Sequence, residues 1–175
     1  MLSSLTGLLS TAERKHGWQL AELAGETTPD GMQRLLRTAH WAADAVRDDR
    51  VASVLAHLAD PQAVLVLEET GCVTKGSTSV GVAPQYGGTV GKIATGQIGV
   101  FLASATRQGP VRLDRELYLP REWAPDPARR AEAGVPGREP TPAAPCLPKP
   151  TLGKQLLERA FAAGVPATGV TADSS

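Results

Sequence analysis

The segment AVLVLEETG, residues 63–71, constrains the fold of this chain more than any other stretch. Residues 63–67 form a continuous apolar run, which is typical of a strand buried on both faces of a sheet. Two adjacent carboxylates, Glu68 and Glu69, follow directly. We expect the strand to end there and to deliver acidic groups to a sheet edge, where hard divalent cations find oxygen ligands. The same pattern also fits an ordinary solvated strand end.

Three other segments have strand patterns, at residues 97–104, 111–120 and from 167 onward. The last reaches an acid, Asp173, in the sequence VTAD. A helix is predicted from residue 151, with apolar residues on one face and a glycine stop at 164. A crossover helix followed by a further strand predicts a mixed α/β sheet. Acids after neighbouring strands would then converge on a cation site, although Asp173 could also be a plain tail acid.

Residues 1–60 are predicted to be helical, before a second region at 61–175. One helix is expected to follow Thr28 as N-cap, with Pro29 in its first turn. A second helix, starting near Trp41, carries one apolar stripe, made of Val51, Val54, Leu55 and Leu58. The pair could form a helix-turn-helix-like DNA-binding unit, or the stripe could serve packing alone. The sequence leaves both open.

Charge and cysteine content narrow the function classes only a little. The chain has 18 acidic and 18 basic residues, so net charge neither announces nor excludes a nucleic-acid binder. Its two cysteines, Cys72 and Cys146, have no metal-ligand spacing. A reduced, cytoplasmic protein is therefore expected. We predict no signal peptide and no membrane span.

Several long blocks of the sequence carry a resemblance to a known family. They are LVLEETG, TKGSTSVGVAPQYGGTVGKI, GQIGVFLAS, DRELYLPREW, KPTLGKQLLERAFAAGVPA and VTAD, and they keep the family's order across residues 61–173. In these blocks the chain resembles bacterial insertion-sequence transposases of the DDE class, which carry a DDE superfamily endonuclease domain. The helical segments before residue 60 also resemble the region that precedes the catalytic domain.

The resemblance implies an α/β, RNase H-like fold. In this chain it would be a partial mixed sheet that follows a helical N-terminal region in the sequence. It implies Mg²⁺-dependent cutting and joining of DNA, with two ions held by three acids. Glu68 matches the first acid and Asp173 the second, whereas the third has no counterpart in these residues. Lys75 and Lys92, in or near the glycine-rich region, are candidate phosphate contacts, although isolated lysines are often plain surface.

Three features depart from the family pattern. The first acid is Glu68 instead of Asp, Pro84 replaces an Arg, and Ser174 and Ser175 follow Asp173 where the family continues with Tyr-Gly. We therefore expect a truncated transposase that is inactive in DNA cleavage and strand transfer. Its expected partners are insertion-element DNA ends and the full-length transposase. The alternatives are a non-catalytic DNA-binding fragment that regulates transposition, or a non-functional remnant whose apolar helix face, Leu156 to Phe161, lies uncovered.

Overall fold

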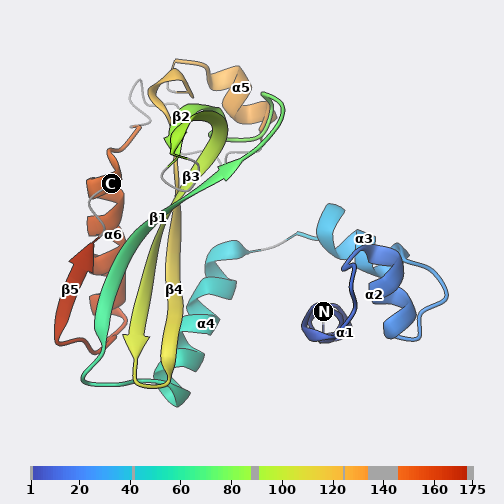
Figure 1. The fold of residues 1–175 in the computed structure, drawn as a ribbon, viewed down its shortest axis with the longest axis horizontal. Coiled ribbons are helices and arrows are strands. Elements are labelled where there is room, and N and C mark those ends of the chain that lie inside the picture. Colours follow the sequence, from blue (N-terminus) through green and yellow to red (C-terminus); the bar gives the residue numbers. More distant parts are fainter. Residues whose placement is uncertain (1, 41, 88–90, 124, 134–145, 173–175) are drawn as a thin grey trace. The chain divides into compact units, whose positions relative to one another are not determined.

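The computed structural model describes residues 2–40, 42–87, 91–123, 125–133 and 146–172 (Figure 1). The chain divides into two compact units, Met1–Val46 and Arg47–Ser175. The division falls inside α4, Ala43–His57, so most of this helix belongs with the second unit. The domain boundary expected at residue 60 stays a prediction.

The first unit is helical, as expected. It contains α1 (Leu2–Leu9), α2 (Gly17–Leu23) and α3 (Asp30–Arg37), with a small core of Leu20, Ala21 and Met32. The ring of His16 caps α2, since its Nδ1 accepts a hydrogen bond from the backbone N–H of Gln19. The predicted cap of α3 is wrong by one position. Pro29 is the N-cap, and the hydroxyl of Thr28 instead donates to the carboxylate of Asp30.

The second unit is a five-stranded mixed sheet, which confirms the predicted α/β class and is compatible with a partial RNase H-like fold. Its strands are β1 (Val64–Val73), β2 (Ala83–Gly87), β3 (Lys92–Thr106), β4 (Gly109–Tyr118) and β5 (Gly169–Ala172). One edge of β3 pairs with β1, and the other pairs first with β2 and then with β4. These ladders are antiparallel, whereas β5 pairs parallel to β1 after the crossover helix α6 (Lys149–Ala162).

Helices α4 and α6 pack on one face of this sheet (Figure 1). The buried cluster between them consists of Val54, Leu65, Val100, Leu102, Leu113, Leu152, Leu156, Ala160 and Val165. The other stripe residues of α4 pack against this cluster, so the structure supports the packing role of the stripe. The expectation of an uncovered α6 face is wrong for Leu156, which is wholly buried, although Phe161 remains exposed.

The predicted end of the first strand is wrong, because β1 continues through both acids to Val73. Its ladder with β3 runs from Val64 opposite Ala105 to Val73 opposite Gly96. Among the added residues, Glu68, Glu69 and Gly71 have low strand propensity, so the extended form of this part of β1 depends on its hydrogen bonds with β3. A Cβ at Gly96 would collide with the carbonyl oxygen of Cys72, so this close approach requires glycine.

A β-bulge interrupts β4 at Leu113. Leu102 pairs with Asp114 and the next residue, Ala103, pairs with Arg112, so Leu113 is the extra residue. The bulge turns two consecutive side chains, Leu113 and Asp114, toward the helix-covered face, and both are buried. Strict alternation would place one of them on the opposite face.

The remaining short helices are η1 (Arg121–Trp123) and α5 (Pro127–Glu132). Trp123 is fully buried, whereas Tyr86 is 57% exposed. Within the described ranges, no helix combines the length and the apolar character that a membrane crossing needs.

Candidate functional site

Glu68 lies in the middle of β1 on the sheet face opposite α4 and α6. Its Oε1 accepts two hydrogen bonds from Arg112, at 3.2 Å from Nε and 3.0 Å from Nη2. The guanidinium of Arg112 also lies over the ring of Phe101, 4.6 Å from the ring centroid. Arg112 of β4 is therefore held by Glu68 and Phe101, and its positive charge balances the negative charge of Glu68, the candidate catalytic acid of β1.

Glu69 points to the other face of the sheet, because successive strand residues alternate. It forms an ion pair with Lys149, at the first residue of α6, and the Lys149 ammonium lies 5.6 Å from the ring centroid of Tyr118. Glu69 thus links the start of the crossover helix to the sheet. The two adjacent acids do not act at one site.

Asp173, the second candidate acid, lies outside the described residues. The last described residue of β5 is Ala172, which pairs with Leu67. The residues that directly precede the two candidate acids are therefore neighbours on adjacent parallel strands. The prediction that the LVLEE and VTAD strands lie side by side is confirmed.

The described residues do not by themselves form a metal site. Among them, no group of three or more His, Cys, Asp or Glu side chains is placed to hold an ion. Glu68 faces a guanidinium, and Glu69 lies on the other side of the sheet. A hard cation such as Mg²⁺ needs several oxygen ligands, which this donor set does not supply.

Lys75 and Lys92, the candidate DNA contacts, are both exposed. Lys75 follows the end of β1, and Lys92 begins β3 opposite Gly87. They belong to a charge pattern that the net charge of the whole chain does not reveal. Residues 71–113 contain Lys75, Lys92, Arg107 and Arg112 but no Asp or Glu, although the whole chain is neutral. Counting charge in windows, instead of over the chain, would have found this basic segment.

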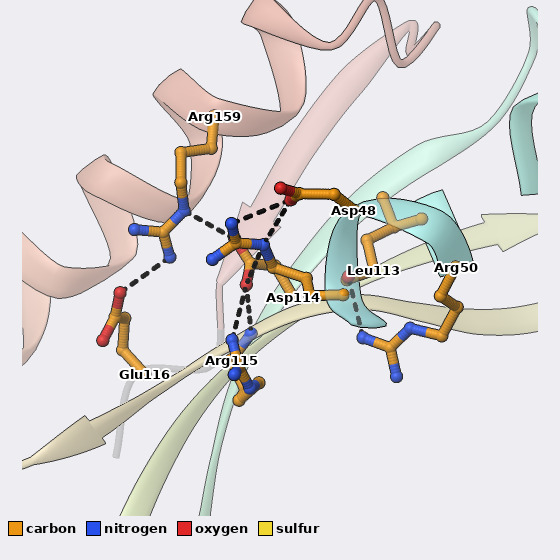
Figure 2. Close-up of polar contacts among 8 residues, drawn as sticks. Asp48, Arg50, Leu113, Asp114, Arg115, Glu116 and Arg159 are labelled. Atoms are coloured by element: carbon orange, nitrogen blue, oxygen red, sulfur yellow. Dashed lines mark hydrogen bonds and ion pairs between the residues drawn. The ribbon is translucent and has the colours of Figure 1, made fainter. Parts of the chain in front are cut away.

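A second polar cluster lies on the helix-covered face, around the buried carboxylate of Asp114 (Figure 2). Arg159 of α6 donates from Nε to Asp114 at 2.7 Å and pairs through Nη2 with Glu116 at 2.8 Å. Arg47 and Arg115 complete the cluster, at 3.8 and 3.6 Å from Asp114 Oδ1. Arg50 separately donates to the carbonyl of Leu113 at 2.8 Å.

Electrostatics keep Arg159 charged in this cluster. Burial alone would lower the pKa of the Arg159 guanidinium, but hydrogen bonds and ion pairs with Asp114 and Glu116 outweigh it and raise that pKa. A cavity of about 350 Å³ adjoins the cluster between α4, β4 and α6. Its charged lining residues are Arg47, Asp48, Asp114 and Arg159, which pair with one another. The arrangement therefore ties both helices to the bulge of β4.

Comparison with known proteins identifies the family. The sequence profile of the DDE superfamily endonucleases matches residues 1–175. The chain belongs to this family. The resemblance found in the sequence is therefore confirmed at the family level.

A curated relative of this DDE superfamily chain comes from Microchaete diplosiphon and is named "Probable transposase for insertion sequence element IS701". It is 30% identical over 116 residues, which cover 66% of this chain and 30% of the relative. The match thus spans less than a third of the relative's length. No solved structure matches the chain.

Proposed function

We propose that this chain is part of an insertion-element transposase and that it contacts DNA through the basic segment 71–113. In this proposal, Glu68 and Asp173 are the positions that correspond to the family's metal-binding acids, and Mg²⁺ is the metal of the family reaction. The observation that supports it best is the parallel pairing of Leu67 with Ala172, because the two acid-bearing motifs then lie on adjacent strands. A cytoplasmic location follows from a DNA substrate, and full-length transposase is the proposed protein partner.

We further propose that this 175-residue chain does not cleave DNA by itself. Arg112 engages the carboxylate of Glu68, which would have to be released before it could bind a metal ion. The described residues also lack the cluster of acids that a two-metal clamp needs. Glu in place of Asp adds one methylene, and a misplacement of about 1 Å can cost roughly 100-fold in rate.

Purified chain is expected to show no Mg²⁺- or Mn²⁺-dependent nicking of the element's terminal DNA. The measurement is a gel assay with end-labelled duplex, and the control is Glu68→Gln. This variant should fold like the parent, because a half-exposed ion pair contributes at most about 1 kcal/mol to stability. Metal-dependent nicking that disappears in Glu68→Gln would contradict the proposal.

A non-catalytic DNA-binding role in regulating transposition is the second candidate, and the acid-free segment 71–113 favours it. It requires DNA binding without cleavage. Binding of this kind would rest on phosphate contacts and would depend little on base sequence.

The affinity for duplex DNA is expected to fall with salt concentration, but with a shallow slope of log K against log salt. The segment has four basic residues, which limits the slope of log K against log salt to no steeper than about −4. The double variant Lys75→Gln/Lys92→Gln should make that slope less negative by about 2. Fluorescence anisotropy at several salt concentrations measures this change. An unchanged slope in the double variant would remove both lysines from the DNA interface.

A further inference from the structure

The hairpin formed by β2 and β3 has two different faces. On one face, Ala83 is buried, and the amide of Gln85 donates to the carbonyls of Gly81 and Gly96 at 3.2 and 2.9 Å. These bonds attach β2 to the turn before it and link the two strands of the hairpin. The opposite face, which we call the hairpin face, consists of Pro84, Tyr86, Ile93 and Thr95, all exposed.

The centre of the hairpin face is an unusual exposed pair. Tyr86 and Ile93 are directly opposite on the two strands and are 57% and 71% exposed. Directly opposite side chains on an antiparallel pair lie within contact distance, so together they form one small apolar platform. An aromatic ring displayed on a hydrogen-bonded ladder is pre-organised to receive a planar partner.

Charge around the hairpin face favours a nucleic acid as that partner. Lys92 directly precedes Ile93 at the turn end of the ladder, so its side chain starts from the opposite face and borders the hairpin face at that end. Lys75 follows Thr74, whose N–H donates to the carbonyl of Thr95 on the hairpin face. No acid lies between residues 71 and 113, and Lys92 is the one charged residue of β2 and β3. The positive charge near this face attracts phosphates. A second copy of this chain has no net charge, so it would not be attracted in the same way.

We propose that the hairpin face binds an unpaired DNA strand, with Tyr86 stacking on a base and Lys92 contacting a backbone phosphate. The inference rests on the proposed DNA-binding function and adds a strand preference to it. Tyrosine on a sheet surface can reach the face of a base only where that base is unstacked, since base faces are covered within a duplex. Stacking on an aromatic ring tolerates any base, so the binding is not sequence-selective.

The test compares the full chain and its variants in binding a short fluorescein-labelled single strand, followed by anisotropy. Tyr86→Ala is expected to weaken binding by about 5- to 100-fold, the loss of one stacked base. Tyr86→Phe keeps the ring and should stay within about 2-fold of the parent. Lys92→Gln should make the single-strand salt slope less negative by about 0.7, the value for one phosphate.

Phe161→Ala is the matched control, because Phe161 is an aromatic side chain of similar exposure, at 54%, on α6. It should leave single-strand binding unchanged. Equal binding by the parent and Tyr86→Ala, or equal losses in Tyr86→Ala and Phe161→Ala, would overturn the inference.

Other outcomes separate this inference from the proposed function. Binding to duplex alone, unaffected by Tyr86→Ala, would remove the inference and leave the proposed function standing. Absence of binding to either DNA would contradict both. Concentration-dependent self-association that is lost in Tyr86→Ala, measured by sedimentation, would assign the hairpin face to a second copy and would also overturn the inference.

Discussion

Asp114→Ala is expected to lower the free energy of unfolding by about 2–4 kcal/mol, because it removes a buried carboxylate that pairs with Arg159 and Arg47. Asp114 is 4% exposed and accepts the 2.7 Å hydrogen bond from Arg159 Nε (Figure 2). Arg47 lies on a second helix at the same carboxylate. Arg159 is itself about a third exposed, so water partly compensates and the loss should fall below that of a fully buried pair.

Urea unfolding followed by circular dichroism measures this loss. The matched control is Glu158→Ala, which removes an exposed ion pair with Lys154 one turn away on α6 and should cost no more than about 0.5 kcal/mol. The double variant Asp114→Leu/Arg159→Met should recover much of the stability, since it removes both charges together. Equal losses for Asp114→Ala and Glu158→Ala would show that the cluster does not stabilise the unit.

Trp123→Ala is expected to destabilise the sheet unit by about 3–5 kcal/mol, the range for deleting a buried aromatic side chain. Trp123 is fully buried, and its Nε1–H donates to the carbonyl of Val82 at 3.0 Å. Arg129 covers the ring at 3.9 Å from its centroid and donates to the carbonyl of Ser77 at 2.9 Å. Trp123 and Arg129 therefore attach the segment after β1 to η1 and α5.

The same substitution should free the segment that contains Lys75. Limited proteolysis with trypsin is therefore expected to cleave after Lys75 faster in Trp123→Ala than in the parent. Trp18→Ala, which removes a tryptophan that is 62% exposed, is the control and should change stability by no more than about 0.5 kcal/mol. Unchanged unfolding of Trp123→Ala, or unchanged cleavage after Lys75, would contradict the proposed attachment.

Local sequence patterns correctly predicted the buried face of one helix and the end of another. The stripe of Val51, Val54, Leu55 and Leu58 predicted the buried face of α4. Gly164, at a positive φ of 78°, ends the crossover region as predicted, because its N–H can return to the carbonyl of Phe161. Helix starts were less predictable. Helix α6 begins at Lys149, two residues before the predicted start at residue 151, because Pro148 already occupies the cap position without a side-chain bond.

The sequence by itself determined the family, the mixed α/β class and the crossover helix that is followed by a further strand, since these follow from apolar period and motif order. Only the tertiary structure decided that β1 continues past both acids, that Glu68 faces Arg112 and that Asp114 is buried beside Leu113. Each of these facts depends on a partner far along the chain, such as Arg112, 44 positions from Glu68. A strand's length, its exposed face and its bulges are set by the register of its neighbours, which no local pattern encodes.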